Sequence, residues 1–140
     1  RRLAEEQPIP IATGEWLATR HEFAELIREG RPRVVQPDVG RVGGLTEALP
    51  VCDLAVDAGL TVVPHLWKTG ISIAAAAHLA AARPEVAMIE FLPAQLCESG
   101  LRRDLTGEEL VMVAGHLAVP TRPGLGIELN RDALAACRAA

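Results

Sequence analysis

The chain has 140 residues, of which 49% are hydrophobic and only 3% aromatic, and it carries a formal net charge of −4. That length and hydrophobic content allow one domain with an aliphatic core and exclude a disordered chain. The acidic balance excludes a basic surface for nucleic acid or an anionic membrane, and the most apolar segment, residues 71–82, is too short to cross a bilayer. Three widely separated cysteines without metal spacing, Cys52, Cys97 and Cys137, predict reduced thiols in a cytoplasmic protein. The sequence begins RRLAEE, without Met, so we expect a fragment of a longer chain.

Short apolar segments alternate with helical patterns in the first two thirds of the chain. A capping box at residues 19–22 and a glycine at position 30 predict one helix, and two more are expected over residues 45–58 and 71–82. Buried strands are expected at residues 9–12, 34–36, 60–63 and 86–89. This alternation predicts βαβ units with a parallel sheet, as in open doubly wound sheets and closed (β/α)8 barrels. No GxGxxG follows a strand, so a dinucleotide-binding fold has no support.

The alternation stops after Leu92. A hairpin is expected over residues 110–119, with His116 in its turn. Asn130 is expected to cap a last helix over residues 131–138. This tail does not continue the strand–helix pattern.

A titratable side chain follows each of the four expected strands. These are Glu15, Asp38, His65 and Glu90, separated by steps of 23, 27 and 25 residues (15 to 38, 38 to 65 and 65 to 90). A step of that size covers one strand, one helix and their loops, so the four groups fall at equivalent places in successive units. In a parallel barrel these places meet at the carboxyl ends of the strands, where active sites form.

Each of these side chains also has a simpler explanation when taken alone. Glu15 could be a solvated loop carboxylate, Asp38 a turn residue and His65 a hydrogen-bonded structural histidine. Glu90 is harder to explain in this way, because a carboxylate between apolar neighbours costs free energy unless it is paired or functional. Taken together, the four residues favour a functional site. Two further residues could reach the same rim, although such residues are more often structural or solvated: Trp67 and Lys68.

The strand ends also carry a family resemblance. The segments PIATGE, QPDVGRVGG, VPHLWKTGISIAAAAHLAAA and MIEF resemble the enolase superfamily, in its mandelate racemase/muconate lactonizing enzyme-like branch with an Asp–His dyad. The resemblance covers about residues 8–91, and PGLGIEL at residues 123–129 resembles the return of the family's chain toward its capping domain. It implies an α/β fold, the C-terminal half of a (β/α)7β TIM-type barrel. Residues 1–92 would be a partial barrel with the last four parallel strands, and residues 93–140 a tail with the hairpin and the short helix.

The resemblance also implies roles for the four residues. Glu15 matches a carboxylate ligand of an essential Mg²⁺, and Asp38 with His65 matches the Asp–His dyad. Glu90 matches a carboxyl group that helps to bind or stabilise an enolate. The superfamily is known for a Lys or His base that works beside Mg²⁺, which suits hard oxygen ligands. Asp38 would orient the imidazole and favour its protonated form, and Glu90, when protonated, could donate a hydrogen bond to the oxyanion.

The function implied is Mg²⁺-dependent abstraction of the proton next to the carboxylate of a small molecule, such as an acid sugar or a 2-hydroxy acid. Dehydration of an acid sugar, a lyase reaction, is our first expectation, because the Asp–His branch contains many such enzymes. Racemisation or epimerisation is the first alternative, and cycloisomerisation the second. The family's lysine base, two more metal carboxylates and its capping domain have no counterpart in this sequence. We therefore expect the 140 residues alone to be inactive and the reaction to need a longer chain.

Two other hypotheses remain open at this point. A half-barrel exposes strand edges and an apolar face, so a non-catalytic fragment that self-associates is the alternative from another functional class. The resemblance could also be of fold alone, with the site residues put to another use. A homo-oligomer is expected in the enzyme case, and neither nucleic acid nor a membrane is expected as a partner.

Overall fold

A computed structural model describes residues 1–67, 69–93, 96, 99–108 and 110–138. The chain divides into two compact units. The first contains Arg1–His65 and Leu79–Glu90, and the second contains Leu66–His78 and Phe91–Ala140. The expected division into a partial barrel and a tail at Leu92 stays a prediction.

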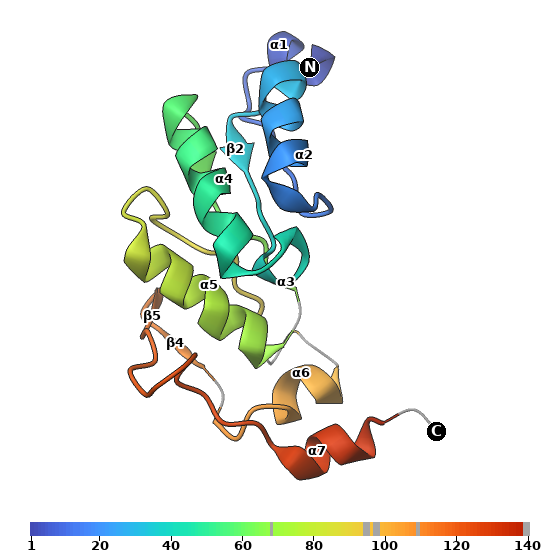
Figure 1. The fold of residues 1–140 in the computed structure, drawn as a ribbon, viewed down its shortest axis with the longest axis vertical. Helices are drawn as coiled ribbons and strands as arrows, with labels where there is room; N and C mark the ends of the chain where they lie inside the picture. The colour runs from blue at the N-terminus through green and yellow to red at the C-terminus, as the bar shows by residue number, and fades with distance from the viewer. Residues whose placement is uncertain (68, 94–95, 97–98, 109, 139–140) are drawn as a thin grey trace. The chain divides into compact units, whose positions relative to one another are not determined.

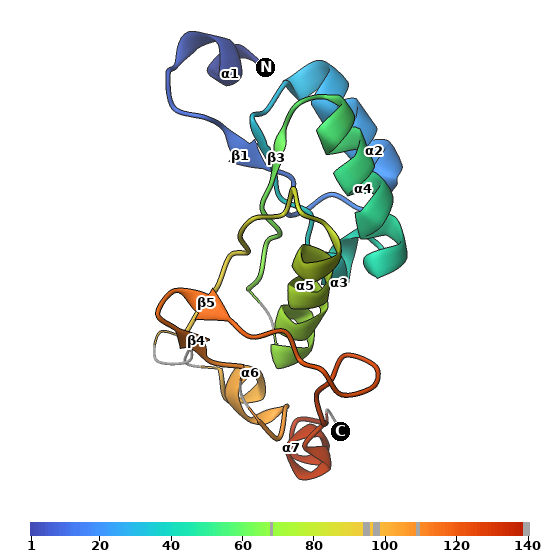
Figure 2. The ribbon, with the colours of Figure 1, turned by 90° about the vertical axis from the view of Figure 1, so that its left-hand side faces the viewer.

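The first unit contains a parallel sheet in the order β1-β2-β3, made of Ala12–Thr13, Val34–Val35 and Thr61–Val62. Ala12 lies opposite Val34, which in turn lies opposite Thr61, so the strands are in register. Helices α2 and α4 lie on one side of this sheet (Figure 2). The predicted parallel arrangement of βαβ units is therefore confirmed.

The fourth expected strand, residues 86–89, is not a strand in the structure. The Val86 N–H donates to the Arg83 carbonyl at 2.9 Å, so the segment begins in a turn around Pro84 and Glu85 rather than in a ladder. It rejoins the sheet pattern at its end, where the Glu90 N–H donates to the Pro64 carbonyl at 3.1 Å.

Four short or medium helices complete this part of the first unit: α1 (Arg2–Glu6), α2 (Thr19–Glu25), α3 (Val39–Val42) and α4 (Leu45–Asp57). A π-helical turn, η1 (Leu26–Gly30), extends α2. Helices α2 and α4 pack side by side (Figure 1). The core between helices and sheet is aliphatic apart from Phe23, as the composition requires, and its fully buried members include Phe23, Val35, Val42, Val51, Cys52 and Val62.

The helix ends follow the expected signals in part. The predicted capping box over residues 19–22 does not form: α2 has Ala18 as its N-cap with no side-chain capping bond, and the Glu22 carboxylate accepts from the Ala18 N–H at 2.6 Å instead of from Thr19. The chain stays helical through Gly30, and Arg31 adopts the left-handed conformation, with φ of 50°. Helix α4 ends before Gly59, as predicted. Gly59 has a φ of 68°, a conformation that glycine adopts without strain.

Helix α5 (Gly70–Ala82) coincides with the predicted alanine-rich helix within one residue. Its residues Ile73 to Ala77 are all buried, which accounts for the nearly uninterrupted run of apolar residues. The longest helices described, α4 and α5, have 13 residues each, and none has both the length and the hydrophobicity that a transmembrane helix needs.

The second unit also contains α6 (Gly100–Asp104), a hairpin and α7 (Arg131–Ala136). The predicted Asn130 cap is confirmed, because its side chain accepts from the N–H groups of Asp132 and Ala133. The predicted hairpin is also present, with β4 (Met112–Val113) antiparallel to β5 (His116–Leu117). His116 was expected in the turn, but it lies in β5 opposite Val113.

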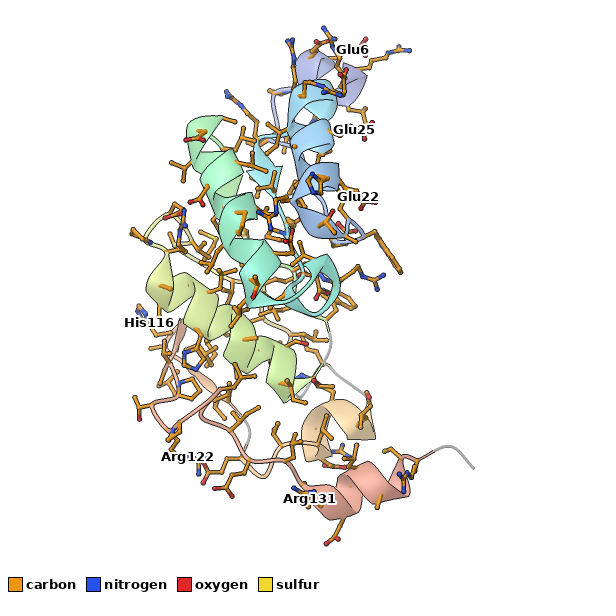
Figure 3. All side chains as sticks on the ribbon, in the orientation of Figure 1. Glu6, Glu22, Glu25, His116, Arg122 and Arg131 are labelled. Atoms are coloured by element: carbon orange, nitrogen blue, oxygen red, sulfur yellow. The ribbon has the colours of Figure 1, made fainter. Side chains whose placement is uncertain are left out.

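The turn of this hairpin contains only Ala114 and Gly115, both with positive φ. Two central residues with positive φ give the twist that a tight hairpin requires, so the third residue joins the strand. His116 is exposed there, as Figure 3 shows.

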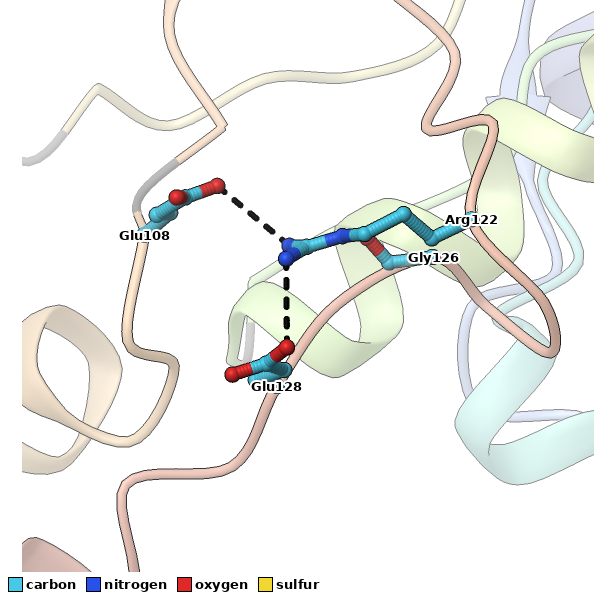
Figure 4. Close-up of polar contacts among 4 residues, drawn as sticks. All are labelled: Glu108, Arg122, Gly126 and Glu128. Atoms are coloured by element: carbon cyan, nitrogen blue, oxygen red, sulfur yellow. Dashed lines mark hydrogen bonds and ion pairs between the residues drawn. The ribbon is translucent and has the colours of Figure 1, made fainter.

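Leu129 pairs with Thr106 in an isolated antiparallel β-bridge, and side chains hold the loop before it. The Arg122 guanidinium lies 3.3 Å from Glu108 and 3.2 Å from Glu128, and its Nε donates to the Gly126 carbonyl at 3.2 Å (Figure 4). His78 Nε2 lies 3.2 Å from the Leu125 carbonyl.

Candidate active site

Asp38 is the buried anchor of the candidate site, with only 1% of its surface exposed. It is the N-cap of α3, and its Oδ1 accepts from the Gly40 N–H at 2.8 Å. Its Oδ2 lies 3.0 Å from His65 Nδ1. An aspartate that caps a helix and holds a histidine at once has little freedom to move, so it fixes the orientation of the imidazole.

His65 follows β3 and Pro64, and its backbone N–H donates to the Pro37 carbonyl at 3.2 Å. Because an ionised carboxylate only accepts hydrogen bonds, we assign a proton to His65 Nδ1. The imidazole is 21% exposed. Its second nitrogen, Nε2, is therefore the atom that can exchange a proton with a ligand.

Glu90 lies on the other side of the imidazole from Asp38. Its Oε2 is 3.8 Å from His65 Nε2, and its side chain is 33% exposed. The separation is an ion-pair distance but too long for a direct hydrogen bond. Asp38, His65 and Glu90 thus form a line of three groups, carboxylate, imidazole and carboxylate, with the open Nε2 edge between His65 and Glu90.

Backbone hydrogen bonds set the order of these residues. The Gln36 N–H donates to the Thr13 carbonyl at 3.0 Å, the His65 N–H to the Pro37 carbonyl at 3.2 Å, and the Glu90 N–H to the Pro64 carbonyl at 3.1 Å. Each bond joins the end of one extended segment to the next. The structure therefore brings Asp38, His65 and Glu90 together at the carboxyl ends of the strands.

Glu15 stands two residues beyond β1, in the turn that the Leu17 N–H closes onto the Gly14 carbonyl at 3.0 Å. Gly14 has a φ of 124°, and a Cβ there would lie 2.8 Å from the Phe23 ring, so the turn needs glycine. Glu15 is partly exposed, and no described residue forms a hydrogen bond or ion pair with it. It belongs to the same set of strand ends, and within the described residues no hydrogen bond or ion pair joins it to Asp38 or His65.

The donor set for a metal ion is incomplete in the part of the chain that the structure describes. No group of three or more His, Cys, Asp or Glu side chains there could hold a metal ion. Glu15 fits Mg²⁺ as a single ligand, because it offers an uncommitted hard oxygen and Mg²⁺ takes one or two protein carboxylates alongside water and substrate.

One contact at this rim was not predicted from the sequence. The guanidinium carbon of Arg41 lies 4.0 Å from the centroid of the Trp16 ring. Its only sequence signal is position, since Trp16 follows Glu15 and Arg41 lies three residues after Asp38. Trp67 is 62% exposed, and Lys68 lies outside the described residues.

Comparison with known proteins identifies the class. Residues 1–133 match the family model of the enolase C-terminal domain-like proteins, and the chain belongs to this family. The predicted superfamily and its mandelate racemase-like branch are thereby confirmed, and so is the fold class, the C-terminal part of a TIM-type barrel.

Similar proteins named for their activity include dehydratases and cycloisomerases. The chain is 36% identical over 141 residues to the D-galactarolactone cycloisomerase of Agrobacterium fabrum, covering 95% of this chain and 36% of that protein. It is 38% identical over 129 residues to the arabinonate dehydratase of Saccharolobus solfataricus, covering 92% of this chain and 34% of that protein. The chain thus spans about one third of the length of these relatives.

Solved structures agree on the fold. The 3,6-anhydro-D-galactonate cycloisomerase of Zobellia galactanivorans superposes with a TM-score of 0.86 at 35% identity, over 96% of this chain and 37% of its own. A mandelate racemase/muconate lactonizing enzyme from Jannaschia sp. CCS1 superposes with a TM-score of 0.85 at 34% identity, over 99% of this chain and 34% of its own.

Proposed function

We propose that this chain, as part of a longer protein, removes the proton next to the carboxylate of an acid sugar and so starts its dehydration. The observation that carries the proposal is the line of Asp38, His65 and Glu90 at the strand ends, with distances of 3.0 and 3.8 Å. A buried acceptor on one ring nitrogen and an open second nitrogen is the arrangement that a general acid–base histidine needs.

His65 is the proton-transfer residue of this proposal. Asp38 holds the Nδ1 proton, so proton exchange is confined to Nε2. The negative charge of Asp38 stabilises the imidazolium that forms when Nε2 takes up a proton. In a dehydration, His65 Nε2 takes the proton from the carbon next to the carboxylate. The electron pair of that carbon–hydrogen bond then forms a carbon–carbon double bond as the carbon–oxygen bond at the β position breaks. Protonated His65 then gives its Nε2 proton to the departing hydroxyl, which leaves as water.

Glu90 is proposed to contact the substrate beside His65. Its carboxyl group is a third exposed and lies 3.8 Å from His65 Nε2, so a substrate atom held at Nε2 would lie close to it. In its protonated form it could donate a hydrogen bond to the oxygen that gains negative charge in the enolate.

Glu15 is proposed to supply one carboxylate ligand to Mg²⁺, with the remaining protein ligands coming from a preceding part of the longer chain. When bound, Mg²⁺ would offset the negative charge that collects on the substrate carboxylate as the proton leaves. The contribution of this chain is to hold Glu15 on the Gly14 turn, at the strand end next to Gln36.

Cycloisomerisation is the second candidate, and two relatives favour it: the Agrobacterium and Zobellia proteins are both cycloisomerases. Both reactions begin with the same proton abstraction and differ in the group that leaves. Mass spectrometry separates them, because a dehydration product is lighter than its substrate by one water and a cycloisomerisation product has an unchanged mass. Racemisation also leaves the mass unchanged, and chiral chromatography of the product identifies it.

The experiment uses the full-length protein with Mg²⁺ and a panel of acid sugars, their lactones and 2-hydroxy acids. The variant His65→Asn should lower kcat by about 10²–10⁴-fold, the usual contribution of a general acid–base group. His21→Asn is the matched control, since His21 is exposed on α2 and should leave turnover unchanged. Full activity in His65→Asn would instead support a likeness of fold with the site residues put to another use.

The non-catalytic alternative predicts a different solution behaviour for the 140-residue chain. Strand β1 has a partner on one edge only in the described sheet, so a second copy could pair with it. Light scattering that finds a stable dimer, with no Mg²⁺-dependent turnover in the full-length protein, would favour self-association over catalysis. We propose a homo-oligomer for the enzyme as well, so the turnover measurement separates the two.

A further inference from the structure

Two residues at the strand ends have no part in the proposed chemistry: Trp16 and Arg41. Their side chains stack, with 4.0 Å between the guanidinium carbon and the ring centroid. Trp16 is 72% exposed, so burial of the indole does not explain its place in a chain with few aromatic residues. The contact joins the turn after β1 to the turn after β2.

Each of these turns carries one residue of the proposed site. Trp16 directly follows Glu15, and Arg41 belongs to the four-residue helix α3 that Asp38 caps. The last backbone hydrogen bond described between the two strand ends joins Gln36 to Thr13. Beyond that bond, the Arg41–Trp16 stack adds a side-chain contact between the two turns.

The stack is the described side-chain interaction of the Arg41 guanidinium. Within the described residues the guanidinium makes no hydrogen bond or ion pair, although Arg41 is only partly exposed. A planar guanidinium lies well over an indole face, and that attraction is what restrains it here. An isolated helix as short as α3 is marginal by itself, so an added contact at its end has a measurable effect on its position.

We infer that the Arg41–Trp16 stack is a positioning contact that fixes the Glu15 turn against the Asp38 turn. It thereby sets the separation between the proposed metal ligand and the proton-transfer dyad, an inference that rests on the proposed function. Neither residue is assigned a contact with substrate. Residues that orient ligands in this way affect metal affinity and activity without touching the reacting atoms.

The first test is hydrogen exchange of the full-length protein without Mg²⁺ or substrate. The variants Arg41→Met and Trp16→Ala should each raise exchange about two- to fivefold at two amides, those of Leu17 and Gly40, which close the two turns. Trp16→Phe keeps an aromatic face and should stay closer to the parent protein. Arg28→Met is the matched control, because Arg28 is exposed and pairs only with neighbouring Glu29 in the described structure.

The second test is Mg²⁺ affinity by titration calorimetry. Arg41→Met and Trp16→Ala should each weaken binding about tenfold, and the double variant should be no weaker than either single variant. Additive losses would mean that the two side chains act independently, which overturns the inference. Unchanged Mg²⁺ affinity in both single variants would also overturn the inference, because the stack would then have no effect on the proposed metal ligand.

Failure of the proposed function has a separate signature. A parent protein that binds no Mg²⁺, or a fully active His65→Asn variant, would contradict the proposed function. The exchange rates would still show whether the Arg41–Trp16 stack links the two turns. Faster exchange at Leu17 and Gly40 in both variants would then support the link between the turns. Unchanged exchange would overturn it.

Discussion

The candidate site in the first unit and the Arg122 loop in the second are held in different ways. At the site, backbone bonds join successive strand ends, and Asp38 is both buried and bonded to Gly40 and His65. The Arg122 loop depends on ion pairs with Glu108 and Glu128, whose side chains are 81% and 79% exposed. Buried, backbone-linked groups resist water and salt, whereas exposed pairs contribute little. The chain therefore holds the candidate site at a more fixed geometry than the Arg122 loop.

The largest effect expected from this comparison is on turnover. In Asp38→Asn the Oδ1 can still cap α3, but an amide N–H would face His65 Nδ1 and favour the wrong tautomer. We expect kcat of the full-length protein to fall by about 10²–10⁴-fold with the fold retained, measured by steady-state kinetics and circular dichroism. Asp132→Asn, in the exposed first turn of α7, is the control. Equal losses in both variants would remove any special role for Asp38.

The next effect is on stability. Phe23 of α2 is fully buried with its ring against the Gly14 turn, so Phe23→Ala should lower the free energy of unfolding by about 3–5 kcal/mol. Leu134 in α7 is 48% exposed, and Leu134→Ala should change the free energy of unfolding by less than about 0.5 kcal/mol. Urea unfolding followed by circular dichroism measures both. Similar losses at the two positions would contradict the contrast between the regions.

A smaller effect is expected in acid, at the pair that joins α2 to α4. Hydrogen bonds from Arg20 lower the pKa of the Glu47 carboxyl to about 2 from 4.5. Because the folded pKa is the lower one, this pair stabilises the fold fully above pH 4.5 and loses its effect as the pH falls toward 2.

The variant Arg20→Gln should therefore raise the pKa of Glu47 and flatten the pH dependence of stability in that window. NMR titration of the Glu47 carboxyl and urea unfolding at several pH values measure the two changes. Arg103→Gln removes a comparable ion pair on one short helix, α6, and serves as the control. A Glu47 titration curve that does not move in Arg20→Gln would exclude the Arg20 side chain as the cause.

The smallest effect is expected at Arg122. Its ion pairs are exposed, so Arg122→Gln should lower the free energy of unfolding by no more than about 1 kcal/mol, and less at high salt. Thermal unfolding at low and high ionic strength checks this. A large loss that persists at high salt would show that the bond from Arg122 to the Gly126 carbonyl, rather than charge, holds the loop.

Much of the first unit was predictable from the sequence because its strands, helices and titratable residues repeat at a regular step. The order of Asp38, His65 and Glu90 follows from that step alone. The prediction of a strand over residues 86–89 was wrong, because an apolar pattern cannot reveal that the Val86 N–H is used in a turn. The prediction that His116 lies in the hairpin turn was also wrong. The sequence Ala-Gly-His is compatible with a two- or a three-residue turn, and only the backbone angles show that the turn has two residues.

The Arg41–Trp16 contact was beyond sequence reasoning for another reason. It joins two turns that the sequence separates by 25 residues, and nothing in the identity of either residue names its partner. Contacts within one helix or turn have fixed spacing, whereas contacts between turns depend on the register of the sheet that carries them.

Burial of Cys52 in α4 has a practical consequence. The thiol is fully enclosed, and desolvation raises its pKa to about 11, so it stays protonated and shielded from reagents while α4 is packed. Cys137, by contrast, is exposed at the end of α7. A thiol reagent added to the native protein would label Cys137 at once and Cys52 only when α4 separates from the sheet. The rate at which Cys52 is labelled, followed by mass spectrometry, would thus report how often the core of the first unit opens.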